Sequence, residues 1–386
     1  MKENRRDFIR KAGVSVAAVS VGSIGAATAA TPAIAPPGKN VSGDALQELM
    51  AKSTIRVAVQ APTEATAQQL SFYKQMGVKH IILWPDDTKG PDYYADRKKY
   101  FGDAGLEVYG LNNNSLLNDE KIVLNMPGRD ERIELYKQHL RALGKAGITY
   151  TTYAHMGNGV WSSADGVARS GAVARSYNPG GESWGQWGDK KYTGPLSHGR
   201  EYTLKEMWAN FEYFIKAVAP VAKESNVRIG ILPDDPPVPK LAGVPRLFSS
   251  FDGYKHAIEL AKSPNVGLCL SVGTWAEGGN KLGKDAAGMI DYFGKQNKLF
   301  KVRVSNIDGS AVFTKTFVDG GNIDMYKVMK ALKKVNFDGV LIADNIPQMI
   351  TQVGGKANEA YDPSLAWTIG YTKCLRDRVE EEAAIA

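Results

Sequence analysis

Short apolar runs alternate with longer amphipathic stretches along most of the chain after residue 50. Each run is five to seven residues long, and most are nearly continuous in apolar character. That pattern is typical of parallel strands that are covered by helices on one side and packed inside a barrel on the other. Eight runs are predicted to be strands: Ile55–Val59, His80–Trp84, Leu106–Leu111, Thr149–His155, Val227–Leu232, Val266–Val272, Phe300–Asn306 and Gly339–Asp344.

The stretches between these runs have helical spacing and helix-ending signals, such as Gly77 and Gly147 after two of them. The predicted helices are Glu64–Met76, Asp130–Ala146, Thr203–Lys223, Phe251–Ala261, Asp285–Gln296, Asp324–Lys334 and Ser364–Glu380. Alternating strand–helix units predict an α/β fold of the (β/α)8 TIM-barrel class over residues 51–386. The main alternative is an open doubly wound sheet. It is disfavoured because "IRVAVQAPTEAT" lacks a glycine-rich dinucleotide fingerprint.

One connection is far longer than the others. Residues 156–199 separate the fourth strand from its helix and carry Trp161, Trp184 and Trp187 among many glycines. Loops of this length are uncommon unless they are functional, and in a barrel this insertion would lie over the carboxyl end of the strands. We expect a lid or a substrate wall. The alternatives are a solvated surface loop or an oligomer contact.

The N-terminal residues have the pattern of an export signal. Residues 1–30 contain the twin arginines Arg5 and Arg6, then a weakly apolar run rich in Ala, Ser and Gly, and residues 31–50 form a linker. This pattern predicts a twin-arginine signal peptide and a periplasmic or extracellular protein. After the first 35 residues, no run is long and apolar enough to predict a membrane anchor.

Composition adds few constraints. The chain has 386 residues and a formal net charge of +7, of which the signal peptide carries +3. The mild basicity of the remainder argues against a nucleic-acid partner and is compatible with an anionic small molecule. The two cysteines, Cys269 and Cys374, cannot form a disulfide framework, and both are expected to be small buried side chains. His139 and His256 fall in predicted helices and are expected on the outer surface.

The stretch "ILPDDPPVP" places Asp234 and Asp235 on a turn that prolines keep out of regular structure. Together with His155, at the end of the fourth strand, these carboxylates are candidate acid–base groups. A capped turn is the structural alternative for the two aspartates. Tyr153 and Trp161 are candidate sugar-stacking residues, and core packing is the alternative for them.

Several motifs resemble mannonate dehydratases. They are "RDERIELYKQHLRALGKAGI", "ILPDDPPVPKLAGVPRLFSSFDG", "GGNIDMYKVMKAL" and "IADNIPQM", in the order found in that family. The resemblance implies a xylose-isomerase-like barrel that binds Mn²⁺ and eliminates water from D-mannonate to give 2-keto-3-deoxygluconate. It also implies metal ligands at four strand ends, namely a His, a Cys, a second His and an Asp. Arg246 matches an arginine of the family.

Only one of the four implied ligand positions keeps its residue, which is Asp344. Leu232 stands at the first His position, Ser271 at the Cys position, and Val302 or Arg303 at the second His position. We favour Arg303 because alternation leaves the valines on the helix-facing side. An alkane side chain cannot bind a metal, and an arginine is always cationic, so the family's Mn²⁺ site is not expected here. A replacement set of His155, Asp234, Asp235, Asp344 and Glu277 is the remaining metal hypothesis.

The sequence therefore predicts a mannonate-dehydratase-like lyase that acts on a sugar acid or oxidised sugar through proton abstraction beside a carboxylate or carbonyl. Arg303 could clamp the substrate or merely pair with Asp344, and Arg246 and Ser271 are further substrate-binding candidates. The alternatives are a sugar isomerase or epimerase, or a non-catalytic carbohydrate-binding relative. A homo-oligomer is left open.

Overall fold

A computed structural model describes residues 48–50, 52–349 and 362–385. Eight parallel strands close into a barrel in the order β1-β18-β15-β14-β11-β4-β3-β2. Each lies within a few residues of a predicted strand: β1 Arg56–Ala61, β2 His80–Leu83, β3 Glu107–Leu111, β4 Tyr150–Tyr153, β11 Arg228–Ile231, β14 Val266–Ser271, β15 Leu299–Val304 and β18 Val340–Ala343. The predicted (β/α)8 TIM barrel is confirmed.

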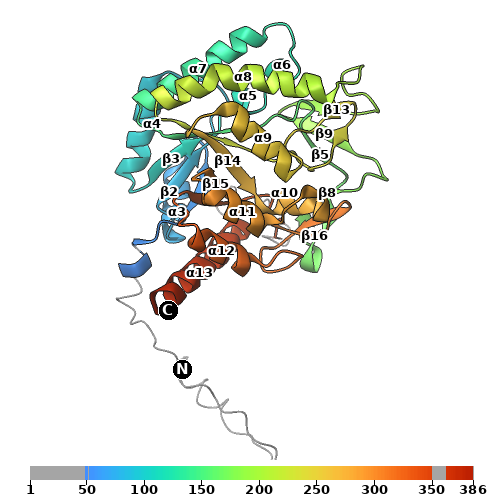
Figure 1. The fold of residues 1–386 in the computed structure, drawn as a ribbon. Helices are drawn as coiled ribbons and strands as arrows, with labels where there is room; N and C mark the ends of the chain where they lie inside the picture. Colours follow the sequence, from blue (N-terminus) through green and yellow to red (C-terminus); the bar gives the residue numbers. More distant parts are fainter. Residues whose placement is uncertain (1–47, 51, 350–361, 386) are drawn as a thin grey trace, which may run out of the picture. The chain divides into compact units, whose positions relative to one another are not determined.

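Helices surround the barrel strands (Figure 1). They are α3 Ala67–Gln75, α4 Pro91–Asp103, α5 Asn114–Leu117, α6 Glu120–Val123, α7 Arg129–Lys145, α8 Leu204–Glu224, α9 Phe251–Ala261, α10 Val272–Glu277, α11 Ala286–Gly294, α12 Met325–Lys334 and α13 Pro363–Ile385. The sequence pattern missed α4, whose wholly buried apolar residues are only Tyr94 and Phe101. Helix α3 begins later than predicted because a capping box between Thr66 and Gln69 fixes its start.

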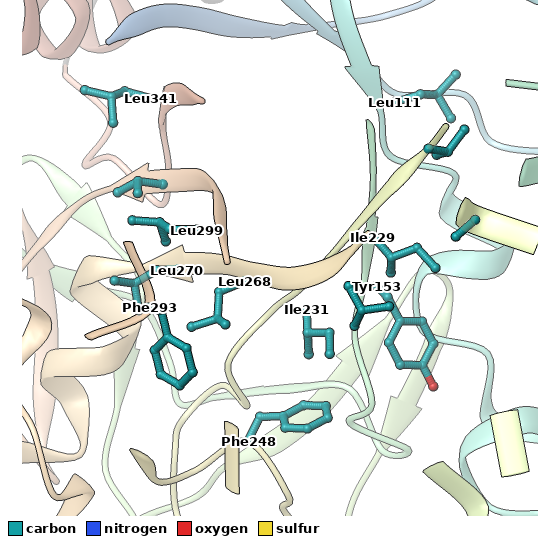
Figure 2. Packing of buried hydrophobic residues seen from close by; sticks show 14 of the residues in the cluster. Leu111, Tyr153, Ile229, Ile231, Phe248, Leu268, Leu270, Phe293, Leu299 and Leu341 are labelled. Carbon is teal, nitrogen blue, oxygen red and sulfur yellow. The ribbon is translucent and has the colours of Figure 1, made fainter. Parts of the chain in front are cut away.

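Two apolar layers build the core. The larger lies between the strands and the helices, and Figure 2 shows Tyr153, Ile231, Leu268 and Phe248 as parts of it. A smaller layer fills the barrel interior and consists of Ala58, Ile82, Tyr109, Tyr150, Phe300, Val340 and Ile342.

Strand β15 contains an irregularity that affects the barrel interior. Its pairing with β14 passes from Leu268–Leu299 directly to Cys269–Lys301, so Phe300 is an extra residue on β15. Phe300 therefore joins the inner layer although its neighbour Lys301 also faces the interior. Bulges of this kind redirect side chains and are common beside active sites.

The long insertion is folded rather than an irregular loop. It forms β5 Val160–Ser162, β6 Gly166–Val167, β7 Val173–Ala174, β8 Ser176–Tyr177, β9 Trp184–Trp187 and β10 Lys190–Tyr192. Strands β10, β9 and β5 form one sheet, and β8 pairs with β17 Phe313–Thr316, which pairs in turn with β16 Asn306–Gly309. β5, β8, β9 and β16 gather at one side of the barrel domain, at the right of Figure 1. The insertion is thus tied to the loop that follows β15.

Two expectations about individual residues are corrected. His139 is fully buried, with its Nδ1 3.3 Å from the Tyr94 hydroxyl, rather than on the outer surface. Cys374 is exposed, whereas Cys269 is buried as expected.

None of the described helices is long and apolar enough to cross a membrane. The signal peptide and most of the linker lie outside the described residues.

Candidate active site at the carboxyl end of the barrel

A cavity of about 130 Å³ opens at the carboxyl end of the strands. A single buried water needs about 10–15 Å³ on the same scale, so the space suits a small polyol. Seven barrel strands or the loops after them contribute to it, as does the insertion. The lining residues are Trp84, Asn112, Leu117, Thr152, Met156, Val160, Trp187, Leu232, Pro233, Asp235, Ser271, Thr274, Lys301, Arg303 and Asn345. The insertion supplies Met156, Val160 and Trp187, which agrees with a substrate wall.

Two basic side chains from β15, Lys301 and Arg303, line this cavity. The Lys301 Nζ is buried and donates to Thr152 Oγ1 at 2.8 Å and to Asn112 Oδ1 at 3.2 Å. No ion pair to Lys301 is found within the described part of the chain. Burial lowers the pKa of Lys301 to about 8.

Arg303 forms an ion pair with Asp344 through its Nη2. The Ser271 hydroxyl lies 3.2 Å from the other Asp344 oxygen and 3.0 Å from Thr274 Oγ1. Val302 is buried in the helix-facing layer and Arg303 lines the cavity, as the alternation along the strand predicted. Three implied ligand positions of the resemblance are thus joined to one another by protein contacts.

Asp235 belongs to a buried charge cluster above the cavity wall. Its Oδ1 accepts from Arg175 Nη2 at 2.6 Å, and its Oδ2 accepts from Thr274 at 3.2 Å. Arg175 also contacts Glu277 at 3.3 Å, and Lys315 lies 2.6 Å from the same Glu277 oxygen. Although burial acts in the opposite direction, the charges of Arg175, Lys315 and Arg303 lower the pKa of Asp235. Asp235 is therefore an ionised cavity residue and a poor proton acceptor.

Asp234 has a different environment from its neighbour. It pairs with Arg246 at 3.4 Å, with no exposed surface on either side chain, and it accepts the backbone N–H of Phe248 at 2.7 Å. Arg246 also donates to Asn158 Oδ1 and to the Gly159 carbonyl. Neither Asp234 nor Arg246 lines the cavity. The pair anchors the proline-rich turn to the start of the insertion.

His155 and Tyr153 face the helix layer rather than the cavity. The His155 Nδ1 lies 2.7 Å from the Tyr153 hydroxyl, and its ring contacts Phe211 and Phe248. Tyr153 stacks on Phe214. Burial lowers the pKa of His155 to about 3, so the ring is neutral and remote from any cavity ligand. The structure does not bring these two residues together with Asp235.

Trp161 packs between the insertion and the β16–β17 pair, in a cluster with Tyr177, Tyr192, Ile307 and Phe313. The aromatic rings that do reach the cavity are Trp187 and Trp84. Trp187 was among the tryptophans that marked the insertion as functional. Trp84 sits at the end of a predicted strand and gave no separate signal.

The donor set at the implied metal position does not fit a divalent ion. Leu232 is a buried hydrocarbon that packs on Cys269, and the Arg303 guanidinium already neutralises Asp344. Within the ranges that the structure describes, no three His, Cys, Asp or Glu side chains are grouped so as to hold a metal. The replacement set of His155, Asp234, Asp235, Asp344 and Glu277 is therefore not assembled, since His155 and Asp234 face elsewhere.

Sequence reasoning selected Asp235, Ser271 and Arg303 but missed other polar residues of the cavity. Lys301 shares a strand face with Arg303 but was not selected, and Asn112 and Thr152 belong to no motif. Arg175 is one of two arginines in the insertion, with Arg169, and nothing in the sequence set it apart. Alternation along β15 is the one signal that could have selected Lys301, because it places Lys301 one step deeper than Arg303.

A closed parallel barrel with a polar cavity at its carboxyl end defines a TIM-barrel protein. Solved structures agree on this fold. The crystal structure of mannonate dehydratase from Streptococcus suis serotype 2 has a TM-score of 0.73 at 23% identity, over 85% of this chain and 96% of that chain. An L-ribulose 3-epimerase has a TM-score of 0.54 at 14% identity, over 86% and 97%. These likenesses show the fold alone.

The sequence places the chain within a family. Residues 189–384, about half of the chain, match the model of D-mannonate dehydratase (UxuA). A mannonate dehydratase of Streptococcus pneumoniae is 30% identical over 270 residues, which cover 64% of this chain and 72% of that protein. One from Oceanobacillus iheyensis is 28% identical over 331 residues, 78% of this chain and 91% of that protein. The chain belongs to the D-mannonate dehydratase family.

Proposed function

We propose that this protein is a hydro-lyase that removes water from a sugar acid bound in the barrel-mouth cavity. The observation that carries the proposal is the pair of basic side chains, Lys301 and Arg303, within a lining of hydroxyl and amide groups. A carboxylate suits the basic pair, and the hydroxyls of a polyol suit Asn112, Thr152 and Ser271. Family membership supports dehydration rather than another reaction of the same fold. The epimerase alternative rests on fold likeness alone.

The test is direct turnover. Purified protein without residues 1–30 is incubated with D-mannonate and with its C2 and C3 epimers, and a 2-keto-3-deoxy acid is sought by mass spectrometry and NMR. We expect D-mannonate or one of these epimers to be dehydrated. If none is consumed, yet one binds in calorimetry, the protein is a carbohydrate-binding relative instead.

We further propose that Trp187 forms the apolar wall against which the substrate carbon chain packs. Replacing Trp187 with Ala is expected to raise KM by up to about tenfold while kcat changes little, because an aromatic contact contributes about 0.5–1.5 kcal/mol. Trp184→Ala is the matched control: it lies on the same strand, β9, but outside the cavity lining. Equal KM values for the two variants would contradict this role.

We also propose that residues 1–30 are a twin-arginine signal and that the protein works in the periplasm or outside the cell. The support is the sequence pattern of Arg5 and Arg6 followed by a weakly apolar run. Changing both arginines to lysine should retain the protein in the cytoplasm with its N-terminus uncleaved. Unchanged export in cell fractionation would rule the proposal out.

Size-exclusion chromatography with light scattering of the mature chain would establish whether it forms a homo-oligomer.

A further inference from the structure

The Lys301 amine is held by two hydrogen bonds to oxygen and by one weaker contact with a thiol. A neutral amine has two N–H groups and one lone pair. Both N–H groups have acceptors, Thr152 Oγ1 and Asn112 Oδ1, and both acceptors also line the cavity. At the remaining position, a lone pair in the amine or a third N–H in the ammonium, the amine has only the Cys269 thiol as a neighbour. A thiol is a weak hydrogen-bonding group, so a molecule in the cavity can replace it there.

The surroundings of Lys301 favour loss of its proton. The charged and titratable groups around it are Arg303 on β15, Cys269 on β14, Asp344 after β18 and the Tyr150 ring on β4, whose centroid lies 5.3 Å from Nζ. Burial is the largest influence and Arg303 acts with it, whereas Cys269 and Asp344 act against it. A lysine that is desolvated beside a second cation is activated as a base or nucleophile.

Arg303 has an unused donor of its own. One terminal nitrogen pairs with Asp344, but its Nε has no hydrogen-bond acceptor in the portion of the chain that the structure describes. Because Asp344 holds the guanidinium in place, Arg303 is a fixed donor at the cavity wall. A fixed cation of this kind stabilises negative charge that develops on a bound oxyanion.

We propose that Lys301 is the catalytic base of this protein and that Arg303 takes up the negative charge that a metal ion would otherwise stabilise. The inference rests on the proposed function. The neutral amine removes the proton from C2 of the sugar acid, and the electron pair moves into the carboxylate, where Arg303 faces the enediolate. That pair then returns to form the C2–C3 double bond as the C3–O bond breaks. The new ammonium gives its proton to the leaving hydroxyl, which departs as water, and the enol becomes the 2-keto acid.

The other acid–base candidates fit this step less well. Both Asp235 oxygens are engaged, by Arg175 and Thr274, and its carboxylate is held ionised. Asp234 and His155 do not line the cavity. Lys301 lines the cavity, and the third position of its nitrogen has no stronger partner than the Cys269 thiol among the described residues.

The experiment measures kcat/KM against pH from 6 to 10 on protein pretreated with EDTA, using the sugar acid that the turnover assay identifies. We expect turnover to survive chelation and to rise with pH through about 8 as Lys301 loses its proton. Lys301→Met and Lys301→Arg should each lower kcat by about 10²–10⁴-fold and should abolish exchange of the C2 hydrogen with D₂O. Both should still bind substrate in calorimetry, whereas Arg303→Met should lose much of that binding.

Lys298→Met is the matched control, since Lys298 immediately precedes β15, donates to the Ser263 and Val266 carbonyls and lies outside the cavity. It should leave turnover unchanged. If Lys301→Met turns over substrate as fast as the wild-type protein and with the same pH profile, the inference is overturned but the proposed function is not. Loss of turnover in EDTA that Mn²⁺ restores also overturns it, as does a borohydride-trapped adduct on Lys301, which would make the amine a nucleophile. If the wild-type protein converts no sugar acid, both proposals are wrong.

Discussion

Replacing Arg175 with Met is expected to lower the free energy of unfolding by about 3–5 kcal/mol, the usual cost of leaving a buried charge without its partner. Arg175 contacts Asp235 at 2.6 Å and Glu277 at 3.3 Å, and both carboxylates are almost fully shielded from solvent. Lys315 would still pair with Glu277, but Asp235 would lose its only directly bonded cation among the described residues. Denaturant unfolding monitored by circular dichroism provides the measurement.

Arg169→Met is the control for Arg175→Met, because it removes a second arginine of the same insertion. The Arg169 side chain is 52% exposed and pairs with Asp319 on the surface, so its loss should cost less than about 1 kcal/mol. The double variant Arg175→Met with Asp235→Asn should recover part of the lost stability, since the orphaned charge is gone. Equal destabilisation by the two arginine variants would show that the buried cluster does not anchor the insertion.

The barrel was predictable because parallel strands leave a strong signal. Runs such as Val266–Val272 must be apolar on both faces, and no other fold needs eight of them in alternation with helices. Helix α4 was not predicted because few of its side chains are buried. In "PDYYADRKKYFGD" the aromatic residues lie among charged residues and do not form an apolar stripe. The insertion was correctly placed over the barrel mouth, but its small strands depend on pairing with one another and with β17, which no local pattern reveals.

The candidate site was only partly predictable, for a physical reason. Arg303 and Asp235 could be selected because strand ends and turns place them at the barrel mouth. His155 could not be excluded from the site on sequence alone. The direction of a side chain just after the end of a strand depends on how the chain leaves the barrel. It leaves here so that His155 and Tyr153 both pack on the helix layer. Lys301 could be selected only with knowledge of its hydrogen-bond partners, Asn112 and Thr152. These lie 189 and 149 residues away in the sequence.

Asp234→Ala is expected to destabilise the fold by about 3–5 kcal/mol, in contrast to the catalytic role that the sequence suggested for Asp234. The substitution leaves the Arg246 guanidinium fully buried without its carboxylate and leaves the Phe248 N–H without its acceptor. Because Asp234 does not line the cavity, kcat per folded molecule should change little, whereas Asp235→Asn should alter turnover directly.

Asp165→Ala, at an exposed position of the insertion, serves as the control and should stay within about 0.5 kcal/mol of the parent. Pairing Asp234→Ala with Arg246→Met should restore part of the lost stability, because both buried charges are then removed together. A variant Asp234→Ala that unfolds like the parent but no longer converts substrate would return Asp234 to the catalytic machinery. The geometry argues for the opposite outcome: of two adjacent carboxylates on one proline-rich turn, Asp234 holds the turn to the barrel and Asp235 faces the cavity.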